Sequence, residues 1–195
     1  MRTGVGGRLN GMSHITVQTH VTLDGVIDSP PEALLPYLSD EGQQATLERA
    51  LAADALLLGR VTWQQLGTVW PSQSTPLAER LNSMPKYVVT STPVELDAWQ
   101  SSTEIDYADV AALRERLDLL SYGCGALARD LLRDGLLDEL LLHMTPVVAG
   151  RGRRLFDDPP GLLAFDLVES HAYPTGALRL VCRPSGRASD LPPRG

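Results

Sequence analysis

Three short stretches of the sequence carry residue types that suit the binding of a phosphorylated ligand. The first places Arg60 and Thr62 directly after Gly59, the second has hydroxyls at Thr90 and Ser91, and the third is the glycine-rich run 123–127. A backbone without Cβ atoms can approach a pyrophosphate closely. The N–H groups and dipole at a helix N-terminus favour the same anion. We therefore predict a nucleotide site assembled from all three stretches.

The guanidinium in the first stretch indicates which nucleotide. An acidic residue at this place would bind the ribose 2′-hydroxyl of NADH. Arg60 stands there instead, and its planar guanidinium suits the 2′-phosphate of NADPH, which is therefore the expected cofactor. Each stretch also has a plainer reading: a tight turn, a surface arginine, or hydroxyls that cap the next turn. The predicted cofactor-binding residues are Gly59, Arg60, Thr62, Thr90, Ser91, Gly123, Cys124, Gly125, Ala126 and Leu127.

A reaction that uses NADPH needs the substrate held beside the cofactor and a source of protons. Asp24, at the mouth of the first predicted strand, is the candidate that would orient the substrate or relay a proton. The alternative is an ordinary aspartate in an Asp-Gly turn. The four histidines are dispersed and have no zinc-ligand spacing, so no metal site is predicted.

These residues must be positioned by alternating strands and helices. Apolar runs and alternation predict strands at 14–23, 55–58, 87–90, 117–122 and 137–145, with helices at 40–52, 60–63, 76–82, 107–116 and 126–134. Asp40 and Gln43 resemble a capping box for the helix at 40–52. Strands at 162–171 and 177–183 read as a closing hairpin. The pattern predicts an α/β fold with a mostly parallel sheet, an antiparallel C-terminal hairpin and helices on both faces.

Composition sets the broad class of protein. The chain has 195 residues, 43% of them hydrophobic, and a formal net charge of −7 that argues against a nucleic-acid surface. No apolar run approaches the roughly 20 residues that cross a bilayer. Two cysteines make no disulfide framework, so a cytoplasmic location is expected. We expect a flexible leader at 1–12, one domain at 13–183 and a disordered tail at 184–195.

The order of these motifs resembles the dihydrofolate-reductase-like family that includes the reductase domain of the riboflavin-biosynthesis deaminase/reductase. The matching stretches are Val21–Ile27, Leu56–Trp63, Met84–Thr92, Gly123–Phe156 and the closing hairpin. The resemblance implies a three-layer fold and a stand-alone, NADPH-dependent reductase, often a homodimer. It also implies a small substrate such as a pteridine or pyrimidine. Tyr122 stands where the riboflavin reductases commonly have a glutamate.

Two other functions compete with this interpretation. One is a nucleotide-binding or regulatory protein on the same fold that no longer catalyses a reaction. The other is a Rossmann dehydrogenase, because Gly123–Ala128 fits the pattern G-x-G-x-x-[GA]. That pattern calls for an acid at the end of the next strand, whereas Asp138 and Glu139 lie at its beginning.

Overall fold

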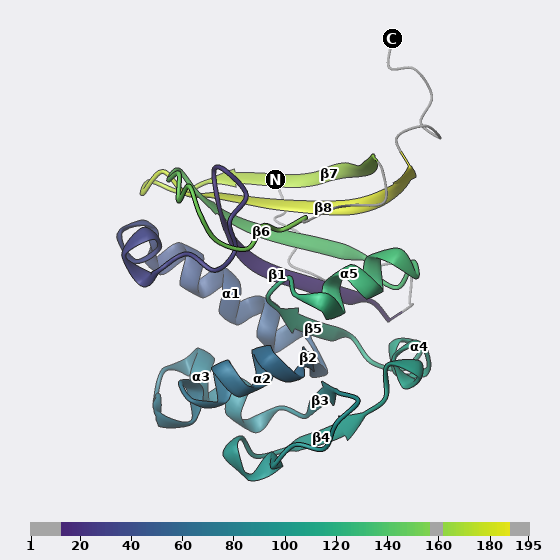
Figure 1. The fold of residues 1–195 in the computed structure, drawn as a ribbon. Helices are drawn as coiled ribbons and strands as arrows, with labels where there is room; N and C mark the ends of the chain where they lie inside the picture. Colours follow the sequence, from purple (N-terminus) through teal and green to yellow (C-terminus); the bar gives the residue numbers. More distant parts are fainter. Residues whose placement is uncertain (1–12, 157–161, 188–195) are drawn as a thin grey trace.

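One eight-stranded sheet runs through the molecule, as the computed structural model shows for residues 13–156 and 162–187 (Figure 1). The strand order is β4-β3-β2-β5-β1-β6-β8-β7. The first six strands in this order are parallel, and β8 and β7 close the sheet with antiparallel pairing. The strands are β1 (Ile15–Thr22), β2 (Ala55–Gly59), β3 (Lys86–Val89), β4 (Ser102–Ile105), β5 (Leu119–Tyr122), β6 (Glu139–Thr145), β7 (Leu163–Ala172) and β8 (Leu178–Arg187). The predicted fold class is confirmed.

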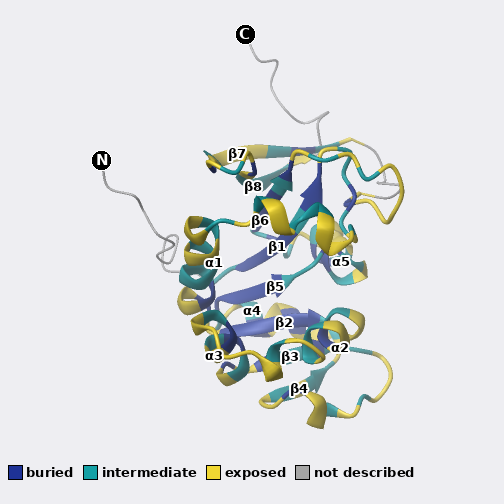
Figure 2. Cartoon of the chain, turned by 90° about the vertical axis from the view of Figure 1, so that its left-hand side faces the viewer, coloured by how far each residue is buried: buried dark blue, intermediate teal, exposed yellow. Residues whose placement is uncertain are grey.

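Helices cover both faces of the sheet, and each face has its own apolar core. One core joins the sheet to α1 and α3, and it also buries Trp63 of α2. The other joins the sheet to α4 and α5. Central strands are therefore buried on both sides, whereas the helices expose their outer surfaces (Figure 2). The helices are α1 (Asp40–Ala52), α2 (Arg60–Gly67), α3 (Pro76–Ser83), α4 (Val110–Arg114) and α5 (Ala126–Arg133).

The start of α1 differs from the predicted capping box. Ser39 is the N-cap, and its hydroxyl accepts a hydrogen bond from the backbone N–H of Gly42 at 3.1 Å. Asp40 is instead the first helical residue, where its charge favours the positive end of the helix dipole. Leu51, at the other end of α1, is 59% exposed.

The sheet contains one strand, and the extension of another, that the sequence analysis did not predict. The edge strand β4 was not predicted, because its Ser-Thr-Glu-Ile segment has little apolar character. Residues 184–187 continue β8 and pair with β7, so the disordered tail predicted from residue 184 is wrong over these four positions. The predicted leader at 1–12 and the rest of that tail lie outside the described residues.

A buried carboxylate ties α1 to the sheet. Glu139, only 4% exposed at the start of β6, accepts hydrogen bonds from Arg49 of α1 at 3.0 Å and from Arg183 of β8 at 2.9 Å. Two cations share one acid, so its desolvation is offset by charge-assisted hydrogen bonds. The contact fixes α1 along the face of the sheet that borders the functional cleft described below.

We expect Glu139→Gln to lower the free energy of unfolding by about 2 kcal/mol, because both arginines lose a charged acceptor. Urea denaturation measures the change. Glu95→Gln, at an exposed glutamate, is the matched control and should stay within about 0.5 kcal/mol of the parent. Equal stability of the two variants would show that the bridge does not hold α1 in place.

Candidate functional site

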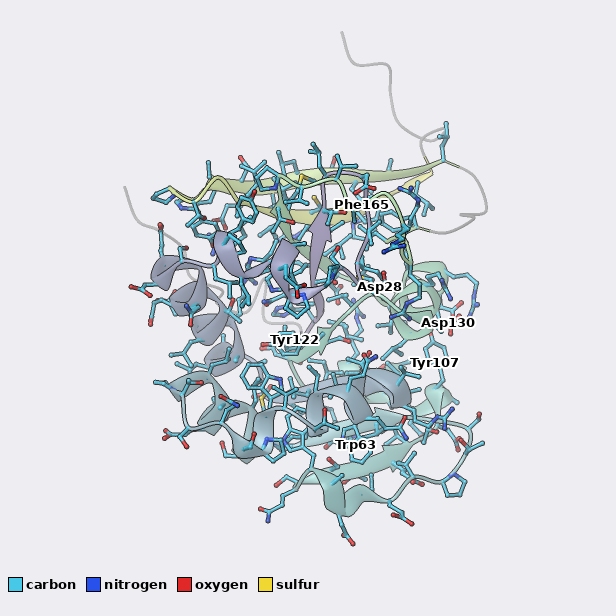
Figure 3. All side chains as sticks on the ribbon, turned by 60° about the vertical axis from the view of Figure 1, so that its left-hand side comes forward. Asp28, Trp63, Tyr107, Tyr122, Asp130 and Phe165 are labelled. Carbon is cyan, nitrogen blue, oxygen red and sulfur yellow. The ribbon has the colours of Figure 1, made fainter. Side chains whose placement is uncertain are left out.

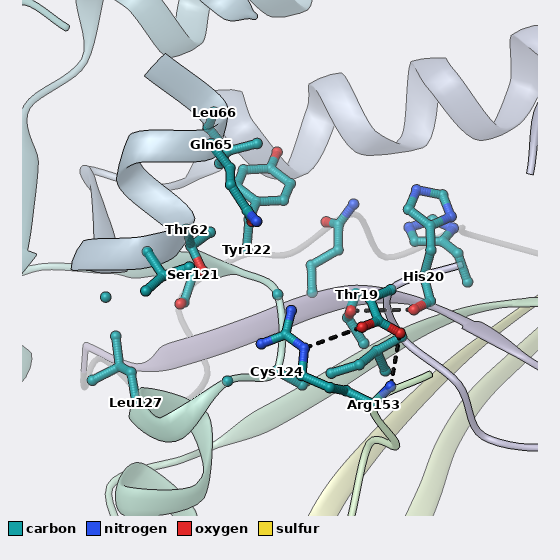
Figure 4. A pocket seen from close by; sticks show the side chains of 18 of the residues that line it. Thr19, His20, Thr62, Gln65, Leu66, Ser121, Tyr122, Cys124, Leu127 and Arg153 are labelled. Carbon is teal, nitrogen blue, oxygen red and sulfur yellow. Dashed lines mark hydrogen bonds and ion pairs between the residues drawn. The ribbon is translucent and has the colours of Figure 1, made fainter. Parts of the chain in front are cut away.

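A cleft of about 1540 Å³ lies along the edge where the parallel strands end (Figure 4). In open α/β sheets, ligands bind at this carboxyl edge. All ten residues predicted to bind a cofactor line the cleft: Gly59, Arg60, Thr62, Thr90, Ser91, Gly123, Cys124, Gly125, Ala126 and Leu127. The three stretches therefore do come together, and their roles toward a cofactor stay a prediction.

Two helix N-termini meet in this cleft. Strands β2 and β5 are parallel neighbours in the sheet, and they lead into α2 and α5. The N-caps are Gly59 and Gly125, and neither has a side chain that could bond the first N–H groups of its helix. Those donors remain for a ligand, and both helix dipoles add positive potential.

The backbone conformation of the turn after β5 favours a glycine. Gly123 has φ +78°, a conformation that side chains rarely adopt, and an added Cβ would lie 3.5 Å from the hydroxyl of Thr62. A Cβ on Gly59 would lie 3.6 Å from Cβ of Leu127. Residues from α2 and from the β5–α5 turn thus share one small space in which backbone groups face a ligand.

The polar side chains in this part of the cleft differ in their partners. Arg60 is exposed, and no carboxylate among the described residues forms an ion pair with it. The hydroxyl of Thr90 donates to the carbonyl of Thr92 and accepts from its N–H, which is the turn-capping role considered as an alternative above. Arg60 is therefore a cation in the cleft that could meet an anionic ligand.

Cys124 offers the cleft its backbone rather than its thiol. The side chain packs in the core beneath α5, and the residue is 5% exposed. Burial raises the pKa of the thiol to about 12, despite a hydrogen bond with Thr19. The thiol is therefore protonated and unreactive at neutral pH.

Asp24 is not among the residues that line the cleft, so the structure does not support the catalytic role predicted for it. Its carboxylate accepts from the hydroxyl of Thr22 at 2.7 Å and from the backbone N–H groups of Ala149 and Gly150 at 3.0 and 2.9 Å. These bonds lower its pKa to about 2. A carboxylate so held ties the loop after β6 to the turn after β1, and it is a poor proton donor.

Asp24→Asn should destabilise the protein, because the amide loses the charge that two N–H groups and a hydroxyl bind. The lowered pKa sets the pH range. The contribution is complete above the unfolded pKa near 3.8 and is lost as pH falls toward 2. We expect the Tm gap between parent and variant to be largest near neutral pH and to narrow below about pH 4. Asp97→Asn, at an exposed aspartate, is the control, and a gap that is constant with pH would contradict the assignment.

The sequence prediction missed a second group of polar residues in the cleft. Gln18, His20, Tyr122 and His143 line it on the side of α1. Gln18 and His20 alternate with the apolar residues of β1, a pattern that reads as a solvent-facing side of a strand. The parallel pairing of β1 with β5 and β6 places that side inside the molecule instead.

Comparison with known proteins identifies the family. Residues 13–178 match the model of the RibD C-terminal domain. The chain belongs to this family. The RibD C-terminal family and its dihydrofolate-reductase-like neighbours have a reductase fold, and the predicted resemblance is thereby confirmed.

Individual relatives share this architecture at low identity. An uncharacterized protein, YyaP of Bacillus subtilis (strain 168), is 25% identical over 175 residues, which cover 86% of this chain and 93% of the relative. A putative riboflavin biosynthesis protein from Shewanella sp. PV-4 superposes with a TM-score of 0.68 at 22% identity, covering 89% of this chain and 99% of the other. Dihydrofolate reductase from Enterococcus faecalis, complexed with NADP(H), gives 0.59 at 15%, covering 89% and 97%. The solved structures establish the fold alone.

Two further properties concern metals and membranes. Within 13–156 and 162–187, no cluster of three or more histidine, cysteine or acidic side chains is arranged to hold a metal ion. In the same residues, no helix combines the length and apolar character needed to cross a membrane.

Proposed function

We propose that this protein is an NADPH-dependent reductase that transfers a hydride to a small heterocyclic substrate of pteridine or pyrimidine type. The observation that carries the proposal is the convergence of two uncapped helix N-termini beside an exposed arginine in one cleft. Membership of the RibD C-terminal family supports a reductase. The dihydrofolate reductase neighbour, whose structure contains NADP(H), has the same fold.

The residues in the cleft fit the proposed cofactor. Gly123 leaves a space that a Cβ would narrow, and the uncapped N–H groups of α2 and α5 suit a pyrophosphate. Arg60 would bind the 2′-phosphate that distinguishes NADPH from NADH. When bound, NADPH supplies the hydride, and the protein orients the reactants and excludes water.

Arg60→Ala should weaken NADPH binding by about tenfold or more, because a charge-assisted contact is worth about 1.5–3 kcal/mol. NADH binding should change by less than about twofold, since NADH has no 2′-phosphate. Fluorescence titration measures both dissociation constants. Arg116→Ala removes an exposed arginine outside the cleft and should leave both unchanged. An equal loss for both cofactors would contradict the role of Arg60, and a preference for NADH in the parent would favour the Rossmann alternative.

Gly123→Ala should weaken the binding of both NADPH and NADH, because the new Cβ strains the backbone and narrows the space at the turn. The matched control is Gly135→Ala, at the end of α5. Gly135 also has a left-handed φ of +68°, but no atom lies within 4 Å of an added Cβ. Both variants should lose roughly 1–2 kcal/mol of stability from the strained conformation. Only Gly123→Ala should lower cofactor affinity, and equal cofactor affinity in the two variants would argue against the turn as a pyrophosphate site.

Turnover distinguishes the reductase from a catalytically silent nucleotide-binding protein. The parent is incubated with NADPH and a panel of pteridines, pyrimidines and carbonyl compounds, and loss of absorbance at the nicotinamide band is followed. Oxidation that depends on a panel member supports the reductase. Tight NADPH binding without oxidation of any panel member supports the silent alternative.

We also propose that the reductase acts as a homodimer in the cytoplasm. The family resemblance supports the dimer, and the small number of cysteines supports a reducing compartment. Sedimentation velocity at micromolar concentration tests the dimer, and a monomer at all concentrations would contradict it.

A further inference from the structure

The polar residues on the α1 side form a compact group deep in the cleft. In the parallel sheet Gln18 of β1 is in register with Tyr122 of β5, and His20 is in register with His143 of β6. Residues two apart on a strand point to the same face, so the four side chains share one face of the sheet. The two imidazole rings stack with their centroids 5.0 Å apart. Tyr122 lies near the centre of the molecule (Figure 3).

Three atoms of this group are buried without a hydrogen-bond partner among the described residues. They are Oε1 of Gln18, the hydroxyl of Tyr122 and Nε2 of His143. Gln18 is 2% exposed and His143 is 8% exposed, yet both line the cleft. Burying an unpaired polar atom destabilises a protein, so three of them on one face of the sheet need an explanation. A ligand that bonds to all three supplies one.

The group carries no charge at neutral pH. Burial, with smaller contributions from His20 and Arg179, lowers the pKa of His143 to about 3. Burial also lowers the pKa of His20 and raises that of Tyr122, so the imidazoles and the phenol are neutral. Gln18 is neutral by nature. These four side chains therefore offer hydrogen-bond donors and acceptors to a ligand but no counter-ion.

Two arginines of the cleft lining, Arg153 and Arg154, bond to protein groups. Arg153 forms an ion pair with Asp28 at 3.2 Å, and Arg154 donates to the backbone carbonyl of Asp24. The side chains of Leu66 and Trp70 add apolar lining. A phosphate in such surroundings would lose its hydration beside neutral side chains and would compete with Asp28 for Arg153. A flat, uncharged ring would lose little hydration free energy on entering, and it would form hydrogen bonds with the three unpaired atoms.

We propose that the α1 side of the cleft recognises an uncharged, flat ring compound without a phosphate group, and that Gln18, Tyr122 and His143 bind its polar edge. The proposal rests on the proposed reductase function, since this compound would be the hydride acceptor. It separates the two ends of the cleft by charge. The phosphates of the cofactor belong at the end with Arg60, and the substrate at the neutral end carries none.

Binding of matched pairs that differ only in a phosphate tests the proposal. Uridine and uridine monophosphate, riboflavin and riboflavin monophosphate, and pyridoxine and pyridoxine phosphate are titrated into the full chain with saturating NADP⁺, and calorimetry gives the dissociation constants. We expect at least one uncharged member to bind, and to bind at least fivefold more tightly than its phosphorylated twin. Tighter binding of the phosphorylated twins, or no binding of any uncharged member, would overturn the proposal.

Two variants connect the binding to the unpaired atoms. Gln18→Leu and His143→Phe keep the approximate shape of each side chain and remove its polar atoms. Each variant should weaken binding of the uncharged ligand at least tenfold. Its Tm should be unchanged or raised, because the variant no longer buries an unpaired polar group. A lowered Tm with unchanged ligand affinity would assign the residues a structural role and overturn the proposal.

Titration of the same variants with NADPH alone keeps the two hypotheses apart. NADPH affinity should match the parent in Gln18→Leu and His143→Phe, whereas Arg60→Ala should keep affinity for the uncharged ring when the titration is repeated without nucleotide. If the parent binds no NADPH, the reductase proposal fails. The titrations of the matched pairs into the parent and into the two variants, repeated without nucleotide, then test the neutral site independently.

Discussion

The adjacency of two parallel strands is the constraint on which the site depends. Because β2 and β5 are hydrogen-bonded neighbours that run in the same direction, the helices that follow them begin at the same edge of the sheet. Both helices begin after a glycine N-cap, so their first N–H groups are left without side-chain partners. Concentrating donors in this way needs no charged residue in the core. Arg60, at the start of α2, is then an addition to a site that the backbone has already made.

Local signals in the sequence were sufficient to predict every strand except β4, the glycine turns and the helices after them. A buried apolar run that stops at Gly59 and a helical period after Gly125 are each visible within about a dozen residues. The parallel topology then predicted a ligand site at the carboxyl edge of the sheet. For this reason all ten predicted cofactor residues do line one cleft.

Features that depend on distant parts of the chain could not be read in this way. Gln18 and His20 look like the exposed side of a strand until β5 and β6 are placed on either side of β1. Asp24 suggested chemistry because it ends a strand, but its partners Ala149 and Gly150 are about 125 residues away in sequence. The cap at Ser39 was missed because Asp40, one residue later, satisfies the same pattern.

The loops around Asp24 have a consequence for the thermodynamics of ligand entry. Backbone bonds join Ile27 to Arg153 and Leu155 to Gly25. Gly152 fits so closely against Val26 and Asp28 that an added Cβ would force their side chains to shift. Asp24 adds the bonds described above, so this part of the rim is ordered before a ligand arrives. Little chain entropy is then lost when the cleft fills. Differences in affinity among ligands should accordingly reflect their direct contacts, and a rigid series of analogues would map those contacts one group at a time.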